Sequence, residues 1–516
     1  MAAAFTRILR ERQPDPAGRS WVYVPYDQLT DEIGPLAAAD PVTVGIVLIE
    51  STAKAARRPY HRQKLALIIA NLRQFALEQA ARGVAVRHVV TAGSYADALA
   101  PLAAELGPLR CMTPAERELR GDLAPLRRSG ALEFVPHAGW LTTTAQFEAS
   151  HPDGAPWRMD RFYRHVRRDS GILMRGSKPE GGKFSFDAAN RRPWRGEPPA
   201  PELPTFRPDE VTAEVLELIE REFGDHPGQL DGASLPATAR DAAELWRWAR
   251  ASCLREFGPF QDAMAAASSS LFHTRISALL HLHRLLPAAV VADVLELDLP
   301  IASREGFVRQ VLGWREFVRH VHAATDGFRR VDCDHLGASR PLPPAFWGER
   351  SGLACLDRVV ADVWREGYGH HITRLMVLAN IATLLDVSPR ELTDWFWVAY
   401  ADAFDWVVEP NVLGMGTFAV GDVMTTKPYV AGSAYVDRMS DYCGSCAFDP
   451  KKTCPLRALY WAFLERHRER LADNPRLAVP LASAAKRSAA QRAGDAAVFE
   501  AVASVLAAGR ELALPH

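Results

Sequence analysis

The chain has 516 residues, 48% of them hydrophobic, which is more than one hydrophobic core usually serves and predicts two or more packed domains. No stretch approaches the roughly 20 apolar residues of a membrane span, and Arg and Pro interrupt the first 20 residues, which excludes a signal-peptide core. We therefore expect a cytoplasmic protein with no membrane partner. The formal net charge of −1 leaves any nucleic-acid binding to local basic surfaces.

Residues 1–140 alternate short apolar runs with amphipathic stretches, the pattern of a parallel sheet covered by helices. We predict strands at Trp21–Val24, Val42–Ile49, Val84–Val90 and Leu132–Val135 in this Rossmann-like α/β domain. No Gly-x-Gly-x-x-Gly follows a strand, so an ordinary dinucleotide site is not expected here.

Residues 141–208 are predicted to form a linker that crosses the surface between two domains. The part from Asp153 to Pro204 is rich in Arg, Lys, Gly and Pro, and it contains Arg161-Phe-Tyr-Arg164. Aromatic residues between arginines suit phosphate contact combined with base stacking, whereas a solvated loop is the alternative. From residue 209 to 516 the pattern is helical throughout, which predicts a larger all-α domain.

The sharpest local signal is Cys443-Gly-Ser-Cys446 followed by Cys454-Pro455. Two thiolates separated by two residues can bind one metal centre while a third thiolate closes the site, and Cys355 is the best fourth ligand. Four cysteines also satisfy tetrahedral zinc, but the closing Cys-Pro pair favours an iron–sulfur cluster. The remaining cysteines stand in unrelated contexts: Cys111, Cys253 and Cys333.

A second constellation is Phe272-His-Thr274-Arg275-Ile-Ser277, whose hydroxyls and cation suit a cofactor pyrophosphate. Three further motifs follow it in the chain: Gly313-Trp314-Arg-Glu-Phe317, His370-His371-Ile-Thr-Arg374, and Trp395-Phe-Trp397 with Asp402 and Asp405. Taken singly, each of these is compatible with ordinary helix packing.

In this order the motifs resemble the photolyase and cryptochrome superfamily. The chain further resembles the bacterial iron–sulfur branch of this superfamily, which includes prokaryotic (6-4) photolyases. The residues that carry this likeness are Cys355, Cys443, Cys446, Cys454 and the segment Asn411-Val-Leu-Gly-Met-Gly. The likeness extends from Asp27-Gln28-Leu29 to Tyr460-Trp461. It implies an amino-terminal domain that binds an antenna and an all-α domain that binds FAD and a 4Fe-4S cluster.

The resemblance implies roles for residues that match its motifs. The cluster ligands would be Cys355, Cys443, Cys446 and Cys454. The neighbours of FAD would be Thr274, Arg275, Ser277, Trp314, Arg374, Asp402, Asp405 and Val408, with an Arg374–Asp402 ion pair near the isoalloxazine. The electron path would use Trp395 and Trp347. The groups beside an antenna, 6,7-dimethyl-8-ribityllumazine, would be Asp27, Gln28 and Glu50.

His371, helped by His370, would donate a proton to the lesion, because an imidazole with an ordinary pKa near 6.5 can take either protonation state. Tyr429 and the basic linker would face damaged DNA, whose lesion must leave the base stack. The chain departs from the family at Val408, where an acidic residue is common and where Glu409 follows. It also departs at Tyr26, which stands where glycine is usual.

Two functions follow from the resemblance. The first is a monomeric, FAD-dependent (6-4) photolyase, a carbon–carbon lyase that repairs a pyrimidine dimer lesion under blue light by electron and proton transfer. The second is a cryptochrome-like photoreceptor with the same cofactors. A zinc-stabilised helical scaffold without redox chemistry is a third and weaker interpretation. His370, His371, Tyr429 and the basic linker favour repair.

Overall fold

The computed structural model describes residues 3–329 and 334–514 of the chain. Its amino-terminal part is a five-stranded parallel sheet in the order β3-β2-β1-β4-β5. The strands are β1 (Ser20–Tyr23), β2 (Val44–Ser51), β3 (Ala85–Thr91), β4 (Leu109–Met112) and β5 (Leu132–Val135), and the helices around them are α1 (Ala4–Arg12), α2 (Gly34–Ala37), α3 (Thr52–Ala56), α4 (Arg62–Ala81), α5 (Tyr95–Leu106) and α6 (Arg117–Arg128).

The predicted α/β domain is therefore confirmed, with one strand more than the sequence pattern indicated. Strand β2 is buried along its whole length because it lies inside the sheet with helices over it. Strand β4 was missed because it is only four residues long and carries the exposed Arg110, so no apolar run marks it.

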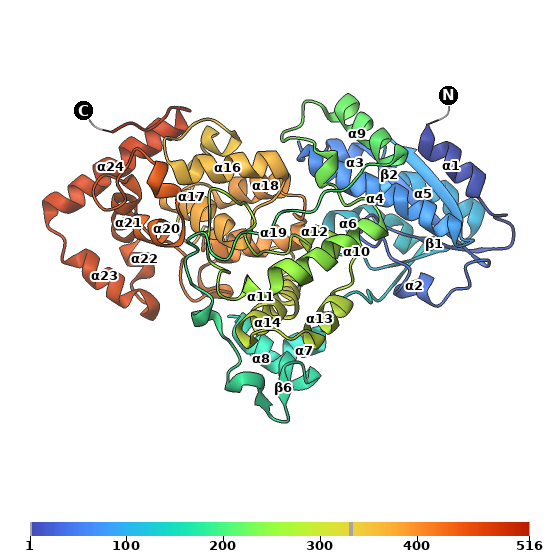
Figure 1. Ribbon diagram of the computed structural model, residues 1–516, viewed down its shortest axis with the longest axis horizontal. Coiled ribbons are helices and arrows are strands. Elements are labelled where there is room, and N and C mark those ends of the chain that lie inside the picture. The colour runs from blue at the N-terminus through green and yellow to red at the C-terminus, as the bar shows by residue number, and fades with distance from the viewer. Residues whose placement is uncertain (1–2, 330–333, 515–516) are drawn as a thin grey trace.

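The predicted linker is not an extended connection. It contains α7 (Thr144–Ser150), α8 (Met159–Ser170) and a small antiparallel hairpin of β6 (Met174–Arg175) and β7 (Lys178–Pro179), which form the lower part of the molecule in Figure 1. Helical periodicity places Phe162 and Tyr163 in the core, while Arg161 and Arg164 remain exposed. The two aromatic side chains are therefore not available for base stacking, and that part of the prediction is wrong.

The rest of the chain is mostly helical, as expected; the larger share of it occupies the middle and left of Figure 1, while α9 lies at the upper right. Its first helix, α9, packs against α1 and α4 of the α/β part. The α-helices are α9 (Glu210–Phe223), α10 (Ala239–Trp248), α11 (Leu254–Phe257), α12 (Ser277–His281), α13 (Pro287–Glu296), α14 (Ile301–Val308), α15 (Glu316–Thr325), α16 (Ala354–Glu366), α17 (Asn380–Leu384), α18 (Pro389–Ala399), α19 (Asp405–Glu409), α20 (Ser433–Met439), α21 (Pro455–Arg466), α22 (Arg468–Leu471), α23 (Ala478–Ala485) and α24 (Ala489–Ala507).

The chain also contains π-helical and 3₁₀-helical segments. The π-helical segments are η4 (Ala249–Cys253), η5 (Arg309–Arg315), η7 (Thr373–Ala379) and η8 (Pro410–Gly416). The 3₁₀ segments are η1 (Glu180–Gly182), η2 (Asp187–Ala189), η3 (Gly232–Ser234), η6 (Pro344–Trp347), η9 (Gly421–Val423), η10 (Tyr442–Ser445) and η11 (Pro475–Leu477). None of the helices in the described residues combines the length and the apolar character that crossing a membrane requires.

Candidate functional site

A cavity of about 300 Å³ lies among the helices of the all-α part. Three π-helical segments, η5, η7 and η8, each contribute residues to its wall. Such wide turns are rare and are frequent at functional sites. The volume is within the range of small-molecule sites. Of the predicted FAD neighbours, the cavity brings together Thr274, Arg275, Ser277, Trp314, Arg374, Asp402 and Val408.

The charged centre of the cavity is the ion pair of Arg374 and Asp402. Arg374 donates through both terminal nitrogens to the two oxygens of Asp402 at 3.0 Å, and its guanidinium lies 3.9 Å over the Tyr400 ring. Ser277 donates to the same carboxylate at 2.6 Å. Burial disfavours the charge of Asp402, but Arg374 and Ser277 outweigh it and hold the pKa of Asp402 below its usual value. The predicted Arg374–Asp402 pair is present.

Arg315, which the sequence motif contains but the prediction did not select, lines the same cavity. One of its nitrogens donates to Glu316 at 2.9 Å, while Nε and Nη2 have no hydrogen-bond partner within the described residues. Burial lowers the pKa of Arg315 to about 10, so the side chain remains charged at neutral pH. A buried cation with free donors fits an anionic ligand group such as a pyrophosphate. Arg275, by contrast, is already paired with Glu366 at 2.6 Å.

The two predicted histidines lie on the cavity wall in different surroundings. His370 is buried and stacks on His273, with 4.3 Å between the ring centroids. His371 is exposed within the opening of the cavity. The surrounding protein and the Arg374 guanidinium still lower the pKa of His371 to about 4. This corrects the expectation of an ordinary pKa near 6.5, since His371 is neutral at pH 7 in the free protein.

The structure also shows which of the neighbouring residues Val408 and Glu409 lines the cavity. Val408 faces the cavity, whereas Glu409 points away and forms an ion pair with Arg117 at 2.6 Å and a 3.0 Å contact with His322. The backbone therefore does not bring the Glu409 carboxylate to the cavity wall, where the resemblance led us to expect an acidic group. The polar residue on this wall is Asn411, one helical turn after Val408.

Asp405 does not line the cavity, so its prediction as a FAD neighbour is corrected. It is fully buried, and its Oδ2 accepts hydrogen bonds from the backbone N–H groups of Arg117 and Glu118 at 2.7 and 3.4 Å. These are orphan donors at the start of α6, where a carboxylate is stabilising. Asp405 thus joins the all-α part to the α/β part.

Neither of the two predicted electron-path tryptophans lines the cavity. Trp395 is 1% exposed and contacts Phe396, a cavity residue, with 5.2 Å between ring centroids. Trp347 is 47% exposed at the surface. Trp364, which the sequence reasoning missed, contacts both of them, at 5.6 and 5.9 Å.

A second cavity, of about 350 Å³, lies beside the carboxyl end of β2. Ligands of parallel α/β sheets bind at this edge. Glu50 lines the cavity, and Arg73 and His88 lower its pKa to about 2 although burial acts in the opposite direction. Tyr26 also lines it, in stacking contact with Phe404.

The other two predicted antenna residues do not reach this cavity. Asp27 accepts a hydrogen bond from the backbone of Ala115 at 3.2 Å, and Gln28 donates to the carbonyl of Met112 at 3.0 Å. Both side chains are buried and hold the loops after β1 and β4 together. Their prediction as antenna contacts is therefore corrected.

The four predicted cluster ligands gather in one place. Burial, followed by charge repulsion from Cys454, Cys443 and Cys446, raises the pKa of Cys355. Cys355 lies in the first turn of α16, and Cys454 is the residue immediately before α21. Both positions place a thiolate near the positive end of a helix. Cys333 lies outside the described residues.

A zinc ion and an iron–sulfur cluster make different demands on four cysteine ligands. A single zinc ion needs four ligands at about 2.3 Å from one point. In the described part of the chain, no group of three or more His, Cys, Asp or Glu side chains is assembled to hold a metal ion. A multi-iron cluster takes each thiolate on a different iron atom, so its ligands stand farther apart. By their chemistry, four thiols suit either a zinc ion or an iron–sulfur cluster.

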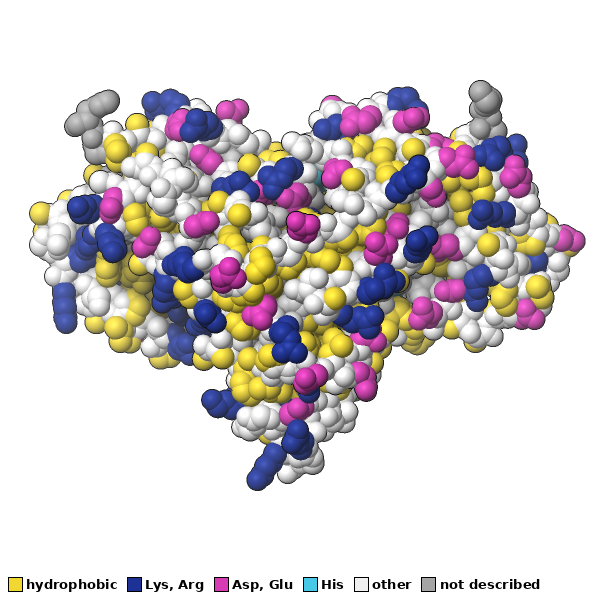
Figure 2. All heavy atoms as spheres, viewed as in Figure 1, with side chains coloured by type: hydrophobic (Ala, Val, Ile, Leu, Met, Phe, Trp, Pro, Cys, Tyr) yellow, Lys and Arg dark blue, Asp and Glu magenta, His cyan; other side chains and the backbone are white. Residues whose placement is uncertain are grey.

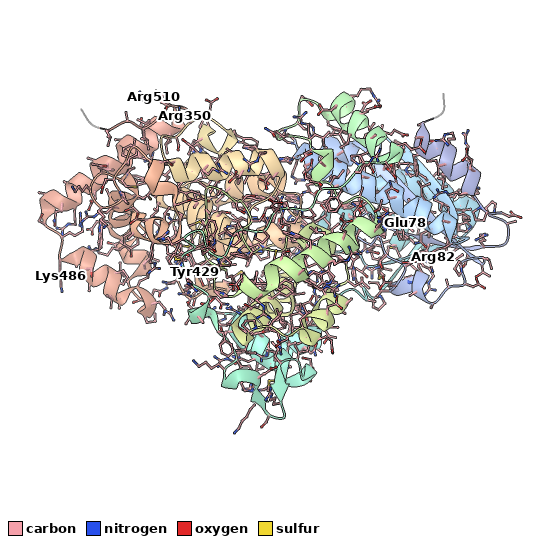
Figure 3. All side chains as sticks on the ribbon, viewed as in Figure 1. Glu78, Arg82, Arg350, Tyr429, Lys486 and Arg510 are labelled. Carbon is pink, nitrogen blue, oxygen red and sulfur yellow. The ribbon has the colours of Figure 1, made fainter. Side chains whose placement is uncertain are left out.

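Tyr429, which is labelled in Figure 3, is partly buried. Figure 2 shows several Lys and Arg side chains in the same region of the surface. Arg476 and Arg191 act electrostatically on it, and Asp187 acts on both Tyr429 and His371. Tyr429 and the mouth of the first cavity are therefore on the same part of the molecule.

The chain is similar to known proteins along most of its length. A family model described as deoxyribodipyrimidine photo-lyase-related protein matches residues 22–235. The chain is 35% identical over 486 residues to a protein of Agrobacterium fabrum named (6-4) photolyase, covering 90% of this chain and 94% of that protein.

Two solved structures share the fold at low sequence identity. A bacterial class III photolyase from Agrobacterium tumefaciens has a TM-score of 0.57 and 15% identity, over 95% of this chain and 99% of that one. An archaeal photolyase from Sulfolobus tokodaii, with two FAD molecules, has a TM-score of 0.59 and 13% identity, over 88% and 99%.

The different positions of Asp402 and Asp405 predict different mutant behaviour. Asp402→Ala leaves Arg374 as an unpaired, largely buried cation, so we expect the purified protein to retain far less FAD. Asp405→Ala removes hydrogen bonds at the start of α6 and is expected to lower the free energy of unfolding by about 0.5–2 kcal/mol while FAD content stays at the wild-type level. Flavin absorbance per chain and urea unfolding measure the two effects. Equal FAD loss in both variants would show that Asp405 is a neighbour of FAD, as the sequence predicted.

Proposed function

Because this chain belongs to the photolyase and cryptochrome superfamily, as a relative of a bacterial (6-4) photolyase, we propose that it binds FAD in the cavity around Arg374 and repairs (6-4) lesions in DNA under blue light. The observation that carries the proposal is the combination in one cavity of a buried ion pair, an arginine with free donors and a histidine open to solvent.

The residues of the cavity would hold FAD by its charged and polar groups. Arg315 has the unpartnered donors that a pyrophosphate needs, and Thr274 adds a hydroxyl nearby. The Arg374–Asp402 pair places a fixed positive and a fixed negative charge on the wall, where they would tune the redox states of the isoalloxazine. Bound and reduced, FAD supplies the electron that light transfers to the lesion and later takes it back.

His371 would supply the proton that the lesion requires. It is neutral in the free protein because the surrounding cavity wall and the Arg374 guanidinium disfavour its charged form. A lesion that has received an electron carries negative charge, which favours imidazolium formation beside it. The Arg374 charge and the lesion charge thus act on His371 in opposite directions, and the second acts only when a proton is needed.

Two further cofactors are part of the proposal. The four gathered cysteines would bind a 4Fe-4S cluster, which would tie the start of α16 to the start of α21. The cavity at the end of β2 would take a small antenna chromophore, and its acidic, basic and aromatic lining suits the heteroaromatic ring and hydroxyls of a ribityllumazine.

Damaged DNA would bind where His371 and Tyr429 share one part of the surface. Arg191 and Arg476 are exposed there, and Lys427 adds a further charge beside Tyr429. The exposed face of α8 with Arg161 and Arg164 would extend the basic surface. These charges would supply the local attraction that a chain with a net charge of −1 does not have as a whole.

The proton-donor role is tested by His371→Asn, which keeps the volume of the side chain but removes its acid. We expect FAD content and DNA affinity to persist while (6-4) repair falls by at least about a hundredfold, the lower end of what a positioned general acid contributes. In wild type, repair should rise as the pH falls from 8 toward 5, because a pKa lowered to about 4 makes the protonated fraction grow in that direction. The variant should lack this rise.

Equal repair by His371→Asn and wild type would remove His371 as the proton donor. If wild type binds reduced flavin and DNA but repairs nothing, the photoreceptor function takes the place of repair.

The cluster is tested by Cys355→Ser, with Cys111→Ser as the matched control at a buried cysteine in strand β4 of the amino-terminal sheet. Serine does not ionise to a strong iron ligand, so the iron content and the broad visible absorption of the cluster should be lost. We expect the control to keep both. Full iron in Cys355→Ser would exclude Cys355 from the ligand set.

The DNA surface is tested through salt dependence. Alanine at Arg191 or at Arg476 should weaken binding and reduce the slope of log K against log salt concentration by roughly one for each lost phosphate contact. The paired variant of Arg161 and Arg164 provides the comparison for α8. A reduced slope only in that pair would place the DNA on α8, and unchanged slopes in every variant would exclude both surfaces.

A further inference from the structure

Helix α1 begins at the edge of the second cavity, the one beside the carboxyl end of β2. The helix precedes residues 22–235, the part of the chain that the photolyase-related family model matches. It packs on α4 and α9 beside the amino-terminal sheet, at the right of Figure 1. Ala3, the N-cap residue of α1, lines the cavity together with residues of α4 and α9. The start of this helix is therefore part of the wall of the proposed antenna site.

Phe5 fastens the first turn of α1 to three other elements. Its side chain is only 3% exposed. The ring meets the His88 ring of β3 edge-on, with 4.8 Å between centroids, and the Arg73 guanidinium of α4 lies 5.3 Å from the ring centre. The backbone N–H of Phe5 donates to Oε2 of Glu214 on α9 at 3.0 Å. This N–H is one of the first-turn donors that have no acceptor within the helix, so the Glu214 carboxylate caps α1.

The contacts of Phe5 lead into the polar wall of the cavity. Arg73 donates to both oxygens of Glu50 at 2.8 and 2.9 Å and to Glu214 at 2.8 Å, and all three residues line the cavity. His88 contacts the same Glu50 carboxylate at 2.8 Å. The Phe5 ring lies against Arg73 and His88, so an apolar group stands where water would otherwise screen these charges. Charge pairs attract more strongly where water is excluded.

The exposed contacts of α1 add less. Arg7 donates to Glu210 of α9 at 2.7 Å, but the two side chains are 46% and 57% exposed, and such pairs contribute little to stability. At the other end of the helix, Gln13 donates to the carbonyl of Val86 in β3 at 2.7 Å. The end of α1 that borders the cavity therefore depends on Phe5 and on its acceptor Glu214.

We propose that α1 closes the second cavity over its ligand, and that Phe5 and Glu214 are the residues that hold it closed. The inference rests on the antenna part of the proposed function, since the ligand is a planar heteroaromatic chromophore such as the ribityllumazine. While α1 is in place, its first turn confines the ligand against α4 and the end of β2. The ligand leaves when this turn detaches, which is a local opening that leaves the sheet intact.

A purely structural role for α1 would be to cover α4 and α9 without acting on the ligand. Both roles predict that truncation of Phe5 loosens the helix. They differ in the behaviour of the ligand, because a helix that closes the site controls how fast the ligand leaves. The bound ligand must then oppose opening of the helix in return, since coupling of this kind is reciprocal.

The first test measures the rate at which 6,7-dimethyl-8-ribityllumazine leaves the protein, from the change in its fluorescence after dilution. We expect Phe5→Ala to release it at least about tenfold faster than wild type, which corresponds to about 1.4 kcal/mol and is less than truncation of a buried phenylalanine usually costs. Phe5→Leu keeps an apolar side chain at this position and should release lumazine at an intermediate rate, which keeps the test available if Phe5→Ala does not fold.

The matched control is Phe499→Ala, which truncates a phenylalanine on α24 that is also 3% exposed. This variant loses a comparable amount of buried apolar surface, but far from α1 in the chain and on a helix that does not line the second cavity. It should release lumazine at the wild-type rate.

The second test follows amide hydrogen exchange of residues 4–12. In ligand-free protein, we expect this exchange to be faster in Phe5→Ala than in wild type and unchanged in Phe499→Ala. Saturating lumazine should slow the exchange of α1 in wild type, which a helix that merely covers its neighbours would not show.

Release of lumazine from Phe5→Ala at the wild-type rate, although α1 exchanges faster, would overturn the closure and leave α1 as a structural cover. Exchange of wild-type α1 that does not respond to bound lumazine would overturn it as well. No uptake of lumazine by wild type would instead overturn the antenna part of the proposed function on which the inference rests. The two failures are distinguishable, because only the first leaves a protein that binds lumazine.

Discussion

The ion pair of Arg374 and Asp402 is the constraint around which the site is arranged. Two charges removed from water are tolerated only when they face each other and their remaining hydrogen-bonding groups are satisfied, and loss of one partner is strongly destabilising. Arg374 meets this condition through Asp402 and the Gly369 carbonyl, and Asp402 through Arg374 and Ser277. The pair therefore fixes three distant segments of the chain around one cavity.

The same region also joins the two parts of the molecule. Three residues after Asp402, Asp405 accepts the first N–H groups of α6, and Glu409 pairs with Arg117 of that helix. Lys64 of α4 donates to the carbonyls of Trp397 and Ala403 from the other side. The two cavities are thus built on shared elements. Helix α16 makes a further connection, since it carries Cys355 in its first turn and, near its end, Trp364, which contacts Trp395 of α18.

Sequence patterns predicted the fold class and most of the cavity, because sheet runs, helical periodicity and ordered motifs are local signals. They failed where a role depends on side-chain direction. Asp27 and Gln28 follow a strand end, as ligand contacts often do, yet their side chains bond to neighbouring loops. The motif suggested that Phe162 and Tyr163 could stack on bases, but their positions on α8 place both side chains in the core.

Other features had no sequence signal at all. The π-helical turns that line the cavity have no compositional mark, and Trp364 belongs to no motif. It contacts Trp347 and Trp395 because the fold brings η6, α16 and α18 together. The depressed pKa of His371 is likewise a property of its surroundings and not of the motif that contains it.

The most direct test of the account is light-dependent repair of an oligonucleotide that carries one (6-4) lesion, by purified protein whose flavin has been reduced in the dark. The account predicts restoration of the undamaged bases under blue light and none in darkness. Bound flavin and bound lesion without any restoration in the light would contradict it.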